Sequence, residues 1–302
     1  MRSCASALAA AVVLLVVGHG AAADDFPRFF VMGDGRLAVE NMHTGARADV
    51  RYRRDDWSYD DDALARLRQA FRSAGDAGEG RLSLRLVEVL SRLQHDSGVR
   101  PLRLVSGYRS PDYNEAIRQR GAKAAGGSLH TEGLAADVAF PRATLKGLWL
   151  KLRALDCCGA GYYAKEGFLH VDVGRPRFWE PQTSRVDENL SAGNARIFAR
   201  TEFDRYAMGE SIVLTLYAIT EPPVRIARAA RLVGATGGTA AATIEGDHPA
   251  GADGCVDVDT SGTSVRATLD GRAPAGHLEL TTCAPRTART PELVGANRTE
   301  LR

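Results

Sequence analysis

The sequence predicts an α+β domain followed by a small β-sandwich-like domain, and three observations lead to this fold class. The chain has 302 residues, the length of about two ordinary domains. Between residues 24 and 181, segments with helical periodicity alternate with strand-like segments. Beyond Pro181, short segments alternate apolar and polar residues between turns rich in Gly, Asp and Pro. We therefore expect domains at residues 24–181 and 190–302.

The N-terminal domain is expected to combine amphipathic helices with short strands that form a small antiparallel sheet. Leu64, Leu67 and Phe71 share one face of a helix that acidic residues can cap, and Ser110 with Pro111 forms a helix start. In chain order, we predict helices at residues 60–71, 83–95, 110–121 and 144–155. We predict strands at residues 101–105 and 135–140, and two more within residues 161–173.

The C-terminal domain is expected to consist of strands. These are predicted at residues 211–220, 254–260, 263–271 and 277–283, whereas the Ala-, Gly- and Thr-rich residues 234–254 are expected to form a loop. Cys255 and Cys283 flank the last strand-like segments, and we expect them to form a disulfide. Adjacent cysteines do not easily bridge each other, so Cys157 and Cys158 are left without a predicted role.

The first 23 residues have the pattern of a cleaved signal peptide. Arg2 precedes an apolar run from Ala5 to Val17, and small residues precede Asp24. No later stretch is long and apolar enough to span a bilayer, so we expect a periplasmic or secreted protein without a membrane span after cleavage. The 39 Lys and Arg against 37 Asp and Glu give a net charge of +2, which argues against a nucleic-acid partner.

Two histidines and an aspartate are the strongest candidates for chemistry. His130 and Asp137 lie seven positions apart in SLHTEGLAAD, and His170 lies in GFLHVDVG. Two imidazoles and one carboxylate suit Zn²⁺ and leave a fourth position for water, which is the pattern of a catalytic zinc site. Gly133 and the neighbouring alanines allow the chain to bend, so that His130 and Asp137 can reach one ion.

The residues around these candidates resemble a known superfamily. SLHTEGLAAD resembles the signature Ser-x-His-x-x-Gly-x-Ala-x-Asp of the zinc D-Ala-D-Ala metallopeptidases, a superfamily that also contains lysostaphin-type enzymes and the hedgehog signalling domain. Within it, SGYRSPDYN (106–114), GAGYYAKEGFLHVDVGRPRFW (159–179) and NMHTGA (41–46) resemble the murein endopeptidase K branch. The resemblance covers roughly residues 28–180 and does not extend to residues 181–302.

The resemblance implies a zinc peptidase that hydrolyses the peptide cross-links of bacterial peptidoglycan. Its metal ligands would be His130, Asp137 and His170, and its substrate would be the peptidoglycan stem peptides. Arg109 corresponds to the arginine that contacts substrate in this superfamily. A guanidinium offers a fork of donors for a carboxylate or a developing oxyanion. His43 and His95 are not expected among the ligands.

The general base cannot be transferred from the resemblance. Several relatives have Glu or His three residues before the last ligand, where this sequence has Gly167. Asp172 and Glu166 lie on the same face of an extended segment as His170, so both are candidate bases. Asp172 could instead orient a metal ligand, and water activated by the metal could need no fixed base.

Two alternative functions stay open at the level of sequence. A D,D- or L,D-carboxypeptidase acting on stem peptides would use the same zinc site. A cell-wall binding protein that has lost catalysis would fit the absence of Glu or His at Gly167. The sequence indicates neither a protein partner nor a role for the C-terminal domain.

Overall fold

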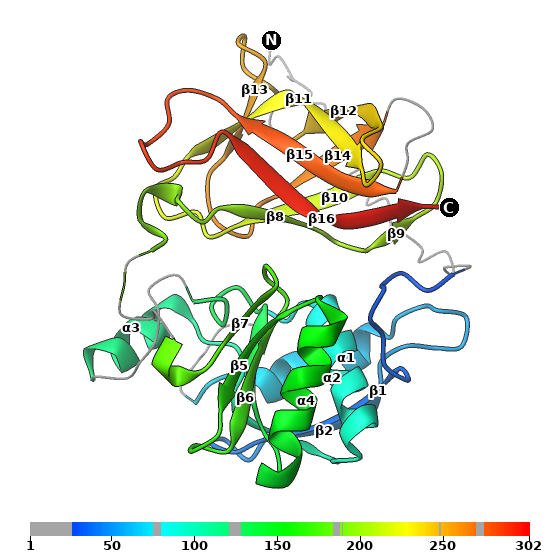
Figure 1. The fold of residues 1–302 in the computed structure, drawn as a ribbon, viewed down its shortest axis with the longest axis vertical. Helices are drawn as coiled ribbons and strands as arrows, with labels where there is room; N and C mark the ends of the chain where they lie inside the picture. The colour runs from blue at the N-terminus through cyan, green and yellow to red at the C-terminus, as the bar shows by residue number, and fades with distance from the viewer. Residues whose placement is uncertain are drawn as a thin grey trace, which may run out of the picture.

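In the computed structural model, the chain forms two regions, each built around its own β-sheet (Figure 1). The structure describes residues 26–74, 80–120, 128–183, 188, 190–247, 249–269 and 275–302. The expected signal peptide at residues 1–23 and Gly121, the expected end of a helix, lie outside these residues. Among the helices that the structure describes, none is long and apolar enough to cross a membrane.

The N-terminal region contains a seven-stranded sheet with the order β2-β1-β3-β4-β6-β5-β7. Its strands are β1 (Arg36–Asn41), β2 (Arg47–Arg51), β3 (Leu102–Ser106), β4 (Ala135–Ala139), β5 (Gly159–Tyr163), β6 (Phe168–Asp172) and β7 (Arg177–Trp179). Its helices are α1 (Asp61–Phe71), α2 (Leu84–Ser97), α3 (Pro111–Gln119) and α4 (Arg142–Leu155), and η1 (Pro181–Thr183) follows as a short 3₁₀ helix. The α+β prediction for this region is confirmed.

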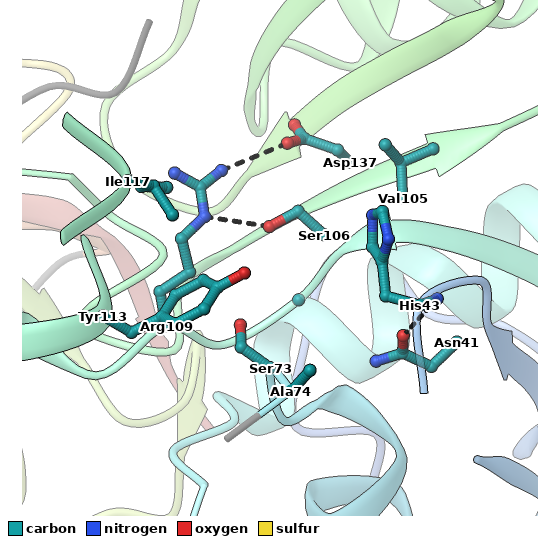
Figure 2. A pocket seen from close by; sticks show the side chains of 11 residues that line it. Asn41, His43, Ser73, Ala74, Val105, Ser106, Arg109, Tyr113, Ile117 and Asp137 are labelled. Atoms are coloured by element: carbon teal, nitrogen blue, oxygen red, sulfur yellow. Dashed lines mark hydrogen bonds and ion pairs between the residues drawn. The ribbon is translucent and has the colours of Figure 1, made fainter. Parts of the chain in front are cut away.

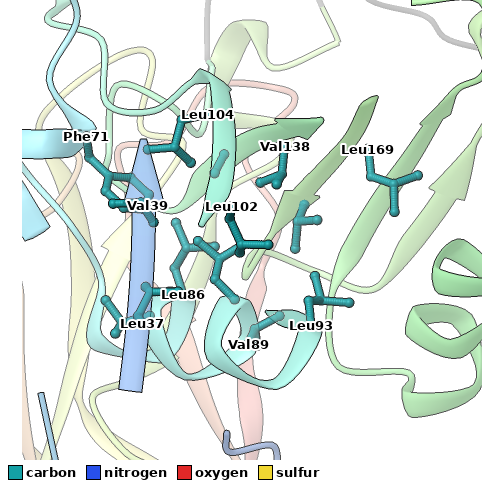
Figure 3. Close-up of a cluster of buried hydrophobic side chains, with 14 of the residues drawn as sticks. Leu37, Val39, Phe71, Leu86, Val89, Leu93, Leu102, Leu104, Val138 and Leu169 are labelled. Carbon is teal, nitrogen blue, oxygen red and sulfur yellow. The ribbon is translucent and has the colours of Figure 1, made fainter. Parts of the chain in front are cut away.

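Local sequence explains where α1 and α3 begin. The Asp60 side chain accepts a hydrogen bond from the backbone N–H of Ala63 at the start of α1, and the Ser110 side chain does the same for Tyr113 at the start of α3. The apolar face of α2 then packs against the sheet. Figure 3 shows Leu86, Val89 and Leu93 of α2 beside buried residues of β1, β3, β4 and β6, and this packing holds the sheet on which the candidate site lies.

The sheet is mixed, which corrects the expectation of a small antiparallel sheet. β1 pairs in parallel with β3, and β5 pairs in parallel with β7. The first pairing is possible because α1 and α2 lie in the connection between β1 and β3, and only a long crossover can return the chain to run in the same direction. The strands that bear the candidate ligands, β4 and β6, are antiparallel as predicted.

The C-terminal region is rich in β-structure, as predicted, and its strands follow the order β8-β10-β14-β12-β11-β15-β16-β9, with β13 paired to β11. The short helix η2 (Ala192–Asn194) precedes β8 (Phe198–Thr201), β9 (Arg205–Tyr206), β10 (Ile212–Tyr217), β11 (Val224–Gly234), β12 (Thr239–Glu245), β13 (Cys255–Val258), β14 (Ser264–Leu269), β15 (Gly276–Thr282) and β16 (Leu293–Leu301). Apolar residues from strands along the whole path form one buried cluster, so the sheet folds over its own core.

Two further expectations from the sequence need correction, one in each region. Residues 234–254 are not a loop throughout, because β12 occupies Thr239–Glu245 and pairs with β11 and β14. Ala and Thr are small, but Ala242 and Ile244 are buried and the backbone hydrogen bonds with both neighbours determine the strand. Cys157 and Cys158 form a disulfide with each other. The chain turns sharply there between α4 and β5, with Asp156 at φ 47°.

The predicted disulfide between Cys255 and Cys283 is confirmed and joins β13 to the residue that follows β15.

Several contacts link the N-terminal region to the C-terminal region. Arg85 of α2 forms an ion pair with Asp204 and donates to the Thr201 carbonyl at 2.9 Å. Phe198 of β8 is buried within the N-terminal core. The two regions therefore share an interface along β8.

Candidate metal centre

The candidate ligands His130, Asp137 and His170 meet on the N-terminal sheet. Asp137 of β4 lies opposite His170 of β6, because the antiparallel register pairs these two residues. His170 Nδ1 lies 2.9 Å from Asp137 Oδ1, and His130 Nε2 lies 3.3 Å from His170 Nδ1. The three donor atoms all lie within 4.8 Å of one another. Strand pairing thus brings together residues that are far apart in the sequence.

His130 reaches this cluster through a tight turn before β4. The Gly133 N–H donates to the His130 carbonyl at 3.3 Å, and Gly133 has a φ of 70°. A Cβ atom at Gly133 would lie 2.5 Å from the carbonyl carbon of Arg81. Both the left-handed backbone and the close approach require glycine here. The glycine of the sequence signature therefore serves to turn the chain between two candidate ligands.

Hydrogen bonds fix the orientation of both imidazole rings. His130 Nδ1 lies 2.8 Å from the Gly107 carbonyl, which leaves Nε2 toward the cluster. His170 Nε2 lies 3.1 Å from Asp172 Oδ2, which leaves Nδ1 toward Asp137. Histidines that bind metals ordinarily donate their second ring N–H to a carbonyl or a carboxylate in this way. The donor set and its anchoring fit a divalent metal ion.

The electrostatics of the cluster also favour a cation. Burial alone would raise the pKa of Asp137, but His130 and His170 hold it well below its usual range. Burial lowers the pKa of His130. For His170, burial is outweighed by hydrogen bonds to Asp137 and Asp172, which raise its pKa to about 9. An ionised carboxylate between two imidazoles is an attractive environment for positive charge.

Arg109 lies directly beside this cluster. Its Nη2 lies 3.3 Å from Asp137 Oδ2, and its Nε donates to Ser106 Oγ at 2.9 Å. A weaker contact joins Nη1 to Asn114 Oδ1 at 3.4 Å. The guanidinium is almost buried, and burial lowers its pKa. These partners hold Arg109 beside the ligand cluster in a fixed orientation.

A cavity of about 240 Å³ opens next to Asp137. Figure 2 shows Arg109 and Tyr113 on one side of this cavity and His43 on the other. His43 thus lies near the site without belonging to the ligand cluster. His95 lies in the last turn of α2 and is not among the described residues that line the cavity. The cavity provides space for part of a ligand beside the candidate metal centre.

Asp172 and Glu166, the two candidate bases, occupy different environments. Asp172 is fully buried and accepts hydrogen bonds from His170, Arg177 and the Gly174 N–H. Burial would raise its pKa, but Arg177 and His170 lower it to about 2. Its carboxylate therefore bonds the outer nitrogen of His170, on the side of the ring opposite the ligand atom, which favours the orienting role. Glu166 lies in the exposed turn between β5 and β6, outside the donor cluster.

The structure reveals neighbours of the site whose roles the sequence did not indicate. The Trp179 ring lies 5.1 Å from the His170 ring, and its Nε1 donates to the Tyr163 hydroxyl at 3.1 Å. Gly161 makes room for this ring, because a Cβ there would lie 2.6 Å from it. Ser106 and Trp179 both belong to sequence blocks that resemble the murein endopeptidase K branch. The resemblance could therefore have drawn attention to both residues. Residue spacing does not show, however, that Ser106 contacts Arg109 or that Trp179 contacts His170.

Comparison with known proteins identifies similar chains. The sequence model of a family described as peptidoglycan L,D-endopeptidase MepK matches residues 32–179. Peptidoglycan L,D-endopeptidase MepK of Escherichia coli strain K12 is 33% identical over 167 residues, which are 54% of this chain and 91% of that relative. The protein of that name from Shigella flexneri matches equally. A probable peptidoglycan L,D-endopeptidase MepK of Haemophilus influenzae is 30% identical over 97 residues, 32% of this chain and 52% of the relative.

No solved structure matches this chain significantly. The family match ends at residue 179. The whole C-terminal sheet, which begins with β8 at Phe198, therefore lies outside the match.

Proposed function

This chain belongs to the family of peptidoglycan L,D-endopeptidase MepK, and from this premise we propose that it is a zinc-dependent endopeptidase. As a member of that family it is a peptidase that acts on peptidoglycan. We propose His130, Asp137 and His170 as its zinc ligands. The observation that carries this proposal is the convergence of the three donors, with the second nitrogen of each imidazole already hydrogen-bonded.

The donor set favours zinc over the harder cations. Two imidazoles and one carboxylate suit Zn²⁺, whereas Mg²⁺ and Ca²⁺ prefer oxygen ligands. When bound, zinc would supply Lewis acidity toward the scissile carbonyl and would lower the pKa of water at the site. Asp137 brings the negative charge, and Gly107 and Asp172 hold the two rings in the orientation that exposes their ligand nitrogens.

Arg109 is the residue that we propose to bind substrate at this centre. Its guanidinium lies against Asp137 and lines the cavity beside it. Donors held in place by Ser106 and Asn114 can stabilise negative charge on a substrate oxygen without moving. We propose that Asp172 orients His170 and is not the base, because its oxygens are already occupied by donors. Among the described residues, Glu166 has no contact that supports a role in proton transfer.

The cleavage of a cross-link requires exposure to peptidoglycan. We propose that residues 1–23 are a signal peptide, that the mature protein is periplasmic or secreted, and that residues 24–181 form the peptidase domain. Residues 190–302 would be a sandwich-like accessory domain. The peptidoglycan substrate of the family and the disulfides support an extracytoplasmic location.

The decisive experiment compares defined substrates. Purified protein is incubated with muropeptide dimers cross-linked through an L,D bond, with dimers cross-linked through a D,D bond, and with monomeric pentapeptides. We expect conversion of the L,D-linked dimers to monomers, loss of this activity with a chelator, and recovery with zinc. Release of terminal D-Ala while dimers stay intact would indicate a carboxypeptidase. Binding of dimers without cleavage would indicate an inactive cell-wall binding protein.

A further inference from the structure

The C-terminal sheet contacts the N-terminal region just after the strand that carries His170. Arg200 of β8 donates from Nε to the Val173 carbonyl at 2.7 Å and from Nη2 to the Gly174 carbonyl. Nη2 also lies 3.4 Å from the Cys157 carbonyl. Val173 and Gly174 directly follow β6, the strand that carries His170. One side chain of the C-terminal sheet therefore holds the segment that follows a proposed ligand.

A short series of hydrogen bonds connects Arg200 to His170. The Val173 carbonyl and the Gly174 N–H belong to the same planar peptide unit. Arg200 donates to the oxygen of this unit, and the Gly174 N–H of the same unit donates to Asp172 Oδ1 at 2.9 Å. Asp172 Oδ2 in turn lies 3.1 Å from His170 Nε2. Because the peptide unit is rigid, holding its oxygen also fixes the direction in which its N–H points at Asp172.

The Asp172 carboxylate has little space in which to move. A Cβ at Gly159 would lie 2.2 Å from Asp172 Oδ2, and a Cβ at Gly174 would lie 2.9 Å from Oδ1. Backbone therefore approaches the carboxylate closely from both sides, and a displacement of either segment would displace the carboxylate. Arg200 touches both segments, through Gly174 and through Cys157, which precedes Gly159 by two residues.

Arg200 is placed here at an energetic cost. No carboxylate among the described residues lies within ion-pair distance of its guanidinium, whose hydrogen bonds go to carbonyl oxygens. Burial, and then the charge of Arg85, lower the pKa of Arg200 to about 9. A buried cation is costly unless it is well hydrogen-bonded, and an apolar side chain would join the two sheets without this cost. Compared with an apolar side chain, Arg200 therefore adds the hydrogen bonds to the carbonyls of Val173, Gly174 and Cys157.

We propose that Arg200 is a positioning residue for the metal centre. By holding the peptide unit between Val173 and Gly174, it fixes Asp172 and, through Asp172, the ring of His170. This inference rests on the proposed metal centre. It also assigns a role to the C-terminal sheet, which lies outside the family match: the sheet completes the support of a ligand in the peptidase region.

The test uses the full chain and Co²⁺ as a spectroscopic substitute for zinc. Arg200→Met removes the donors but keeps an unbranched chain. Arg205→Met is the control, because Arg205 of β9 also joins the regions through carbonyls, those of Pro27 and Phe29. Arg205 also forms an ion pair with Glu300, and its interactions among the described residues include none with β6 or the turn after it. Arg200→Lys keeps the charge and has one donor group in place of the fork. The readouts are the Kd for Co²⁺ by chelator competition, the visible spectrum of bound Co²⁺, and the Tm.

We expect Arg200→Met to raise the Kd for Co²⁺ about 10-fold and to change the spectrum, since loss of support around a ligand typically weakens metal binding by 10- to 100-fold. Arg205→Met should lower the Tm but leave the Kd and spectrum as in the wild type. Arg200→Lys should lie between wild type and Arg200→Met.

Two results would overturn the inference. One is a wild-type Kd and spectrum in Arg200→Met, or in Arg200→Lys if the Met variant does not fold. The other is an equal loss of affinity in Arg200→Met and Arg205→Met, which would mean that any loosening of the interface has this effect. Wild-type protein that binds no Co²⁺ would instead overturn the metal centre itself, and the role of Arg200 with it.

Discussion

The Asp172→Asn substitution separates the two roles that a carboxylate next to His170 could have. Four donor contacts converge on Asp172: Gly174 N–H at 2.9 Å and Arg177 Nη1 at 3.0 Å on Oδ1, and His170 Nε2 at 3.1 Å and Arg177 Nη2 at 2.9 Å on Oδ2. Asparagine has the same shape but only one acceptor oxygen. In either orientation, its amide nitrogen must face donors that have lost their acceptor.

The fall in zinc affinity depends on which donor loses its acceptor. If the amide oxygen of the introduced asparagine points toward the Gly174 N–H, the amide nitrogen faces His170 Nε2. His170 then loses the acceptor that keeps its proton on Nε2. A ring protonated on Nδ1 cannot offer that atom to a metal. We therefore expect zinc affinity to fall by about 10- to 100-fold, which corresponds to about 1.4–2.7 kcal/mol. Arg177 is half exposed and can be solvated, so it adds little to the loss.

The assay measures the zinc Kd by chelator competition and the hydrolysis of cross-linked dimers over a range of zinc concentrations. An orienting role predicts weaker zinc binding, together with substantial recovery of activity when zinc is saturating. If Asp172 were the general base, the variant would bind zinc like the wild type and stay inactive at saturating zinc. That second pattern would refute the orienting role of Asp172.

Three further predictions concern single residues or pairs. His170→Ala should lose stoichiometric zinc and turnover, because only two ligands remain, and metal analysis that finds one tightly bound zinc would contradict the site. Arg109→Lys should keep zinc but lower kcat/KM by about 100-fold or more, since the fork of donors is lost; wild-type activity would make Arg109 structural. Replacing Cys255 and Cys283 by Ser should lower the free energy of unfolding by about 3.5 kcal/mol in the chain-entropy model, because the bridge spans 28 residues. Denaturant titration measures this loss, and free thiols at both positions in the unreduced protein would show that the bridge does not form.

The elements that depend only on neighbouring residues could be predicted from the sequence. The periodic apolar residues of α1 and α2 and the cap residues Asp60 and Ser110 determine helices within a few residues of their observed ends. The sequence also predicted that the chain turns at Gly133 and brings His130 and Asp137 together, because such a turn depends on nearby residues. The cystine of Cys255 and Cys283 was predictable since both residues flank strand-like segments.

The hydrogen bonds and the parallel strand pairing that join distant segments were not predictable. Alternation along a strand places Asp172 on the same face as His170, but it does not show that Asp172 bonds the outer nitrogen of the ring. That assignment depends on the pairing of β6 with β4 and β5, which turns Nδ1 toward Asp137. The parallel pairing of β1 with β3 and the reach of Arg200 to Val173 also join distant segments, whereas the disulfide between the adjacent residues Cys157 and Cys158 depends on the sharp turn between α4 and β5. The sequence alone determined which donors are available and which helices form, because these depend on neighbouring residues. Only the tertiary structure decided which donor meets which acceptor, since a hydrogen bond acts over about 3 Å and the pairing of the strands sets where each side chain lies.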